Sequence, residues 1–159
     1  RKYSASHLEW VISNLRAVKD DPFIACDVIT GLPGDEKEDF EITRRFLEEK
    51  QFAALHVFPF SPRPDTPLMN AKDRVEERVR DERALILREL SNKLSDAYIT
   101  RQIGKKSEVL LESRKNGAFY GTTGNYLKVK IDSVPLSAQR GEILKGHIEK
   151  KGVFVVDES

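Results

Sequence analysis

The alternation of helical and strand-like patterns in the first part of the chain constrains the fold more than any other feature. Residues 6–19 carry an apolar residue every three or four positions, which predicts an amphipathic helix with Trp10 in its apolar face. Residues 23–31, FIACDVITG, are typical of a strand that is buried on both faces of a parallel sheet. Residues 35–50 and 55–58 repeat the helix and the strand. This order predicts right-handed βαβ connections and parallel strands.

Each predicted strand runs into a distinctive loop. The first leads through a glycine-rich turn to Asp35 and Glu38, which have the spacing of a capping box at the start of a helix. The second runs into LHVFPFSPRPDTPL, residues 55–68, whose prolines predict a rigid, extended loop. Because ligands bind at the carboxyl ends of strands in barrels of alternating strands and helices, both loops are candidates for a ligand site. A tight turn without any ligand explains the glycines equally well.

The second part of the chain has a different pattern. Residues 72–100 predict one long amphipathic helix whose many arginines and glutamates form a solvated face. From Gly104 onward, short β-rich runs are separated by glycines, which is typical of a small antiparallel barrel. We therefore expect two domains, 1–102 and 103–159.

Charge and cysteine content limit the possible functions. The chain has 159 residues and a net charge of +1, but ten basic and seven acidic residues follow position 102. This excess indicates either a polyanionic partner or a solvated basic face. The single cysteine, Cys26, excludes a disulfide or a multi-cysteine metal cluster held by this chain, and we expect it to be a packed strand thiol. No apolar run approaches the ~18 residues of a membrane span, so we expect a cytoplasmic protein with no membrane partner.

Two long motifs in the same order carry a family resemblance. DVITGLPGDEKEDF (27–40), LHVFPFSPRPDTP (55–67) and the later GTTGNYLKV (121–129) closely resemble the carboxyl-terminal half of the radical S-adenosylmethionine methylthiotransferases. The sequence HVFPFSPR most resembles the corresponding motif of the branch that acts on threonylcarbamoyladenosine in tRNA. The resemblance implies an α/β fold, with part of a parallel (β/α) barrel followed by a TRAM domain, a small β-barrel that binds tRNA.

The resemblance also implies cofactors. The full-length enzymes use S-adenosylmethionine and 4Fe–4S clusters, but the three-cysteine motif that holds the reactive cluster is absent from this sequence. We therefore expect that this chain binds no cluster and is inactive without the missing amino-terminal part of the parent enzyme. Two parallel strands also leave unpaired edges, so self-association is expected.

Particular residues acquire expected roles from the resemblance. Ile29 and Gly31 would lie beside the adenine of S-adenosylmethionine, and Phe58, Ser61 and Arg63 would complete that wall. The alternative for Arg63 is a surface ion pair with a helix acid. The residues expected to contact tRNA are basic or aromatic, namely Lys105, Lys106, Arg114, Lys115, Tyr126, Lys128 and Lys130. The alternative is that the aromatic residues of the tail fill the barrel.

The expected function is methylthiolation of N6-threonylcarbamoyladenosine in tRNA by radical S-adenosylmethionine chemistry. The parent reaction would insert sulfur and a methyl group into a C–H bond of the modified adenosine. One alternative is an RNA-binding module without catalysis, whose α/β half is a structural remnant. The other is the branch of the family that modifies a ribosomal protein.

Overall fold

The structure is a computed structural model that describes residues 3–157. The chain forms two compact units, the first ending at Asp96 and the second beginning at Ala97, so the division lies within helix α3 (Glu77–Gln102). Within the described residues, none of the helices combines the length and the apolar character that a membrane span requires.

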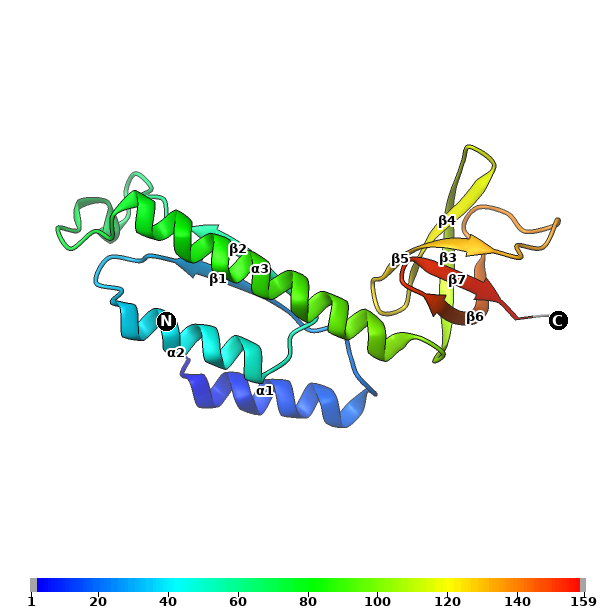
Figure 1. Ribbon diagram of the computed structural model, residues 1–159, viewed down its shortest axis with the longest axis horizontal. Helices are drawn as coiled ribbons and strands as arrows, with labels where there is room; N and C mark the ends of the chain where they lie inside the picture. Colours follow the sequence, from blue (N-terminus) through cyan, green and yellow to red (C-terminus); the bar gives the residue numbers. More distant parts are fainter. Residues whose placement is uncertain (1–2, 158–159) are drawn as a thin grey trace. The chain divides into compact units, whose positions relative to one another are not determined.

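The first unit has the helix and strand order that the sequence predicts (Figure 1). Its elements before α3 are α1 (Ala5–Val18), β1 (Ala25–Thr30), α2 (Lys37–Glu49), β2 (Ala54–Pro59) and the 3₁₀ helix η1 (Pro67–Asn70). Strands β1 and β2 pair in parallel, with Ala25 opposite Ala54 and Thr30 opposite Pro59. The parallel pairing is confirmed, whereas a two-stranded sheet does not by itself show the expected part of a (β/α) barrel.

The sheet is covered on one face. Val28 and Leu55 are buried in a core whose other members come from α1, α2, α3 and the segment before β2, namely Ile12, Phe40, Leu47, Phe52, Leu87, Leu90 and Leu94. On the opposite face, Ile29 is 42% and Phe58 is 52% exposed. The prediction that residues 23–31 form a strand buried on both faces is therefore wrong, because α1, α2 and α3 all contribute to the core on the same side.

Two local expectations in the first unit also change. Trp10 was expected in the core but is 68% exposed, and α1 turns Ile12 inward instead. The turn that begins α2 is shifted by one residue, because the N–H of Glu36 donates to the carboxylate of Asp39 at 3.1 Å. This shift leaves Asp35 available for a different contact, described below.

The second unit contains a barrel. Within the described residues, five strands close in the order β3-β4-β5-β7-β6. Their bounds are Lys106–Lys115, Ala118–Thr123, Lys128–Asp132, Ile143–Lys150 and Val153–Val156 for β3 to β7. The barrel is mixed, not antiparallel as predicted, because β5 and β7 pair in parallel. An odd number of strands cannot alternate in direction all the way around a closed ring, so one parallel pair is required. A closed five-stranded barrel fits the expected TRAM-like fold.

A close backbone approach at Gly146 gives a test of the barrel. A Cβ at this position would lie 2.0 Å from the carbonyl oxygen of Val155, across the β6–β7 pair. We expect Gly146→Ala to lower the free energy of unfolding of the second unit by about 2 kcal/mol or more. Gly124→Ala is the control, because a Cβ there would meet nothing within 4 Å, and it should change stability by less than about 0.5 kcal/mol. Urea denaturation measures both variants, and equal stability losses would contradict this account of the barrel.

Candidate functional site

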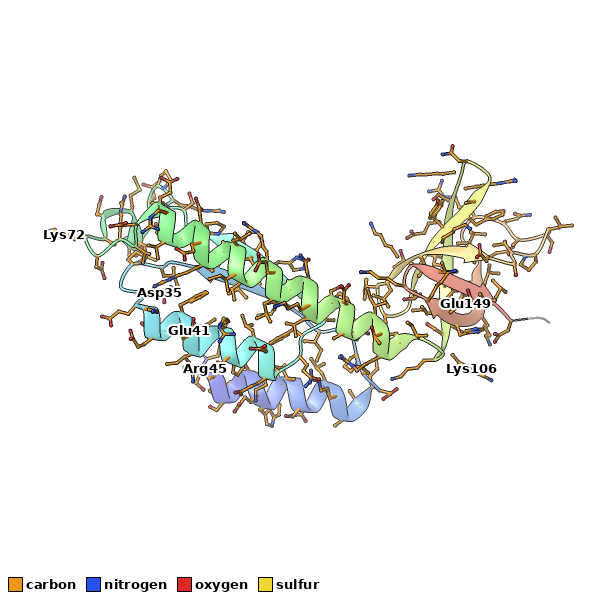
Figure 2. All side chains as sticks on the ribbon, viewed as in Figure 1. Asp35, Glu41, Arg45, Lys72, Lys106 and Glu149 are labelled. Atoms are coloured by element: carbon orange, nitrogen blue, oxygen red, sulfur yellow. The ribbon has the colours of Figure 1, made fainter. Side chains whose placement is uncertain are left out.

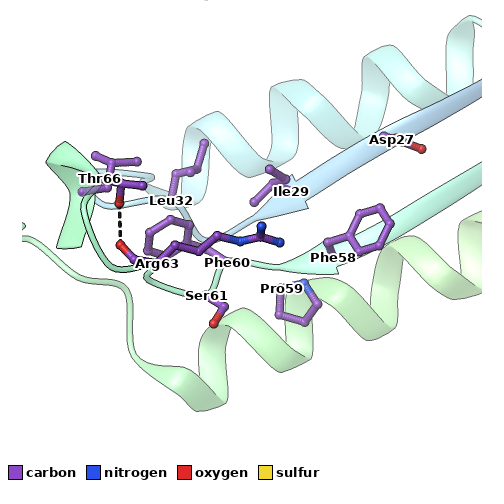
Figure 3. A pocket seen from close by; sticks show the side chains of 10 residues that line it. Asp27, Ile29, Leu32, Phe58, Pro59, Phe60, Ser61, Arg63 and Thr66 are labelled. Carbon is purple, nitrogen blue, oxygen red and sulfur yellow. Dashed lines mark hydrogen bonds between the residues drawn. The ribbon is translucent and has the colours of Figure 1, made fainter.

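The open face of the sheet carries a cavity of about 650 Å³ at the carboxyl ends of the strands (Figure 3). Strand β1 and its following turn supply part of the lining, and β2 with the proline-rich loop supplies the rest. The lining residues are Asp27, Ile29, Leu32, Phe58, Pro59, Phe60, Ser61, Arg63, Thr66 and Leu68. Of the residues predicted to contact S-adenosylmethionine, Ile29, Phe58, Ser61 and Arg63 are thus brought together, whereas Gly31 does not line the cavity.

The cavity combines an apolar floor with the guanidinium of Arg63. Ile29 and Phe58 are opposite each other in the sheet register, and both side chains are largely exposed. Arg63 lines the same cavity, and Figure 3 shows its side chain extended from the proline-rich loop toward the part of β1 that carries Ile29. In residues 3–157, no ion pair or hydrogen bond engages this guanidinium, so the surface ion pair considered for Arg63 is not formed. An apolar floor and a guanidinium in the same cavity suit a ligand that has both a flat ring and an anionic group.

Hydrogen bonds hold the proline-rich loop against the end of β1. The N–H of Phe60 donates to the carbonyl oxygen of Thr30 at 2.9 Å, and the hydroxyl of Thr66 donates to the carbonyl oxygen of Arg63 at 2.8 Å. The guanidinium of Arg80, in α3, donates to the carbonyl oxygen of Phe60. The loop is therefore fixed by contacts to β1 and α3 as well as by its prolines.

Gly31 has a structural role in the turn after β1. Its φ is +69°, and a Cβ there would lie 2.2 Å from Cγ of Arg80. The absence of a side chain at Gly31 thus lets the side chain of Arg80 pack directly against the turn. The N–H of Gly31 donates to the carboxylate of Asp35 at 3.1 Å, which holds the turn in this conformation.

Arg83 of α3 completes this arrangement. Its guanidinium donates to both the carbonyl oxygen and the carboxylate of Asp35, at 3.0 and 3.1 Å, and lies 5.3 Å from the centre of the Phe40 ring. Figure 2 shows Asp35 at the start of α2, between α2 and α3. Arg83 is only 8% exposed, so the interpretation of its helix as having a uniformly solvated charged face is wrong at this position. Sequence reasoning missed Arg80 and Arg83 because they look like the other arginines of a highly charged helix.

The barrel carries a separate basic depression of about 480 Å³. It is lined by Lys115, Lys128 and Lys130 around Tyr120, together with Glu112, Ser113, Gly121, Val129 and Gly152. Tyr120 and Lys130 are opposite each other on β4 and β5. Lys130 also donates to Asp132 at 2.9 Å, and this hydrogen bond raises the pKa of Lys130, so the ammonium stays charged. Three of the lysines predicted to contact RNA are thus brought together.

The other predicted RNA residues lie elsewhere on the unit. Tyr126 is 75% exposed, so the alternative that it fills the barrel is wrong, and Phe154 takes that place at 0% exposure. Tyr126 lines a different depression together with Glu108 and Glu112. Arg114 lies 5.1 Å from the centre of the Phe119 ring. Lys105 directly precedes β3 and Lys106 is its first residue, and neither lines the basic depression.

No metal site is formed by the residues that the structure describes, since no group of three or more histidine, cysteine, aspartate or glutamate side chains converges. Cys26 packs against the core of the first unit, as expected for a strand thiol.

Curated proteins similar to this chain are tRNA-modifying enzymes. The chain is 31% identical over 157 residues to the threonylcarbamoyladenosine tRNA methylthiotransferase MtaB of Treponema pallidum, which covers 98% of the chain and 32% of that protein. It is 40% identical over 131 residues to the tRNA-2-methylthio-N(6)-dimethylallyladenosine synthase of Endomicrobium trichonymphae, covering 81% of the chain and 31% of that protein. It is also 32% identical over 157 residues to MtaB of Bacillus subtilis, covering 96% of the chain and 34% of that protein. No family model matches the chain.

The relatives of this chain are therefore enzymes that modify tRNA. More narrowly, the chain is a homologue of part of the tRNA methylthiotransferases, as its two motifs indicated. It spans about one third of the length of these relatives.

The contact between Arg83 and Asp35 can be tested by mutation. We expect Arg83→Ala to lower the free energy of unfolding by about 2 kcal/mol, because it leaves a half-buried carboxylate without its cation. Hydrogen exchange at the amide of Gly31 should accelerate at the same time, since Asp35 also holds that group. Arg78→Ala is the control, because the Arg78–Glu82 pair is exposed and 3.9 Å long. Equal effects of the two substitutions would show that the Arg83 contact does not stabilise the turn.

Proposed function

We propose that this chain is part of a tRNA methylthiotransferase that acts on N6-threonylcarbamoyladenosine. The first unit contributes a wall of the S-adenosylmethionine site, and the second unit binds tRNA. The observation that carries this proposal is the open apolar groove lined by Arg63, whose guanidinium has no ion pair or hydrogen bond within residues 3–157. The relatives named above support the reaction class.

The groove residues fit S-adenosylmethionine. Ile29 and Phe58 offer an apolar surface for the adenine ring, and Arg63 offers a charge-assisted hydrogen bond to a carboxylate. When bound, this cofactor supplies the methyl group and the radical chemistry of the reaction. The residues of this chain do not fit an iron–sulfur cluster, because such clusters need several thiolates and Cys26 faces the core.

The basic depression of the barrel fits tRNA. Lys115, Lys128 and Lys130 supply cations for phosphates, and Tyr120, which lines the same depression, supplies an aromatic face. Tyr126 lies in a different depression, whose described lining residues include Glu108 and Glu112 but no lysine or arginine. Tyr120 shares its depression with one of these glutamates, Glu112, but also with three lysines. We therefore assign base stacking to Tyr120 in preference to Tyr126, and we place the reaction in the cytoplasm.

The cofactor wall can be tested by titrating the chain with S-adenosylhomocysteine, a stable analogue, while recording amide NMR spectra. We expect shifts at residues 28–31 and 57–63, and a dissociation constant at least tenfold higher for Phe58→Ser, because about 1.4 kcal/mol of apolar contact corresponds to a factor of ten. Leu85→Ser is the control, since Leu85 is 56% exposed on α3 and does not line the cavity. Shifts confined to other residues would refute the proposed site.

The RNA surface can be tested by measuring tRNA affinity at several salt concentrations. Each phosphate contact contributes ~0.7 to 0.9 to the slope of log affinity against log salt, so Lys128→Ala with Lys130→Ala should flatten the slope by one to two such contributions. Tyr120→Ala should weaken binding at every salt concentration by roughly 1 to 3 kcal/mol, and Tyr126→Ala should have a smaller effect. Lys37→Ala with Lys72→Ala, in the first unit, is the control. An unchanged slope in the folded Lys128/Lys130 variant would remove these lysines from the RNA site.

A further inference from the structure

Two polar side chains lie on the open face of the sheet beside the apolar floor that Ile29 and Phe58 form. Asp27 of β1 and His56 of β2 are opposite each other in the parallel register, and both are exposed. Asp27 lies two residues before Ile29 in β1, and His56 lies two residues before Phe58 in β2. Because side chains two residues apart point to the same side of a strand, all four share one face of the sheet. Figure 3 shows Asp27 farther along β1 from the proline-rich loop than Ile29.

Neither polar side chain is engaged within residues 3–157. The thiol of Cys26 donates to the main-chain carbonyl of Asp27, but no hydrogen bond or ion pair reaches the Asp27 carboxylate or the His56 imidazole. Their backbones are ~4.8 Å apart across the strand pair, so one ligand group can reach both. Together with Arg63, this face therefore offers one anionic acceptor, one imidazole and one guanidinium.

Asp27 and His56 lie close enough to the proposed cofactor residues to contact the substrate. Asp27 and His56 lie ~6.6 Å along their strands from the residues that would hold the cofactor, a distance within the length of a nucleoside substituent. A substrate that reacts with a cofactor on Ile29 and Phe58 must approach this same face. The pair is therefore placed to contact the group that distinguishes one modified adenosine from another.

We infer that Asp27 and His56 select the substituent on N6 of the substrate adenosine and favour a polar one over a dimethylallyl group. This inference rests on the proposed function. A threonylcarbamoyl group has hydroxyl and N–H groups that can donate to the Asp27 carboxylate, and a carboxylate that can accept from the N–H of His56. A dimethylallyl group offers none of these, so placing it here would remove water from two polar groups without replacing their hydrogen bonds. A site that hydrogen-bonds its substrate discriminates strongly against an analogue that lacks the bonding groups.

The test compares two nucleosides on the chain itself. N6-threonylcarbamoyladenosine and N6-dimethylallyladenosine are titrated separately while the amide NMR signals of residues 26–29 and 55–58 are followed. We expect the threonylcarbamoyl nucleoside to bind at least tenfold more tightly. His56→Phe should bring the affinity ratio close to one by weakening the polar ligand and favouring the apolar one, and Asp27→Asn should weaken the polar ligand alone. His147→Phe, in the barrel, is the control and should leave the ratio unchanged.

Each outcome decides the inference. Equal affinity of the wild-type chain for both nucleosides would overturn it, as would an unchanged ratio in both the His56 and the Asp27 variants. Because both side chains are exposed, these variants should keep the native circular dichroism spectrum. Binding of S-adenosylhomocysteine and tRNA without nucleoside selectivity would overturn this inference alone. Failure of the chain to bind either of those two ligands would contradict the proposed function itself.

Discussion

One-sided burial of the β1–β2 sheet is the constraint on which the first unit depends. Val28 and Leu55 face a core shared with α1, α2 and α3. Because side chains alternate along a strand, burying this set turns Asp27, Ile29, His56 and Phe58 to the opposite face. The hydrophobic core thus decides which side chains the open face exposes, and a shift of one residue in register would bury these four side chains instead.

Long-range contacts from α3 give the edge of this face its shape. Arg80 reaches the carbonyl of Phe60 and fills the space that Gly31 leaves, while Arg83 holds Asp35. The turn after β1 and the loop after β2 are therefore fixed by the same helix. A substitution of Arg80 or Arg83 would alter the edge of the open face even though neither arginine lines the cavity.

Local patterns in the sequence predicted the helices, the parallel strand pair and the closure of the tail into a barrel. The family resemblance, not the local patterns, predicted that Ile29, Gly31, Phe58, Ser61 and Arg63 would share one site, and all of these except Gly31 line the cavity. What local patterns could not predict depends on packing between distant elements. The exposure of Trp10 and Ile29, the burial of Arg83 and the separation of Tyr126 from the lysines follow from which helix covers which face and how the barrel closes. The parallel pairing of β5 and β7 results from the closure of five strands into a ring, so it cannot be predicted from the sequence of either strand alone.

The central claim is that the cofactor and the RNA are bound by separate surfaces, the open face of the first unit and the basic depression of the barrel. Hydrogen–deuterium exchange, followed by mass spectrometry on the chain with S-adenosylhomocysteine or with tRNA, tests this claim directly. We predict that the cofactor analogue protects the segments 26–31 and 55–63, and that tRNA protects 113–122 and 128–132. Protection of the same segments by both ligands, or no protection of the open face by the cofactor analogue, would contradict it.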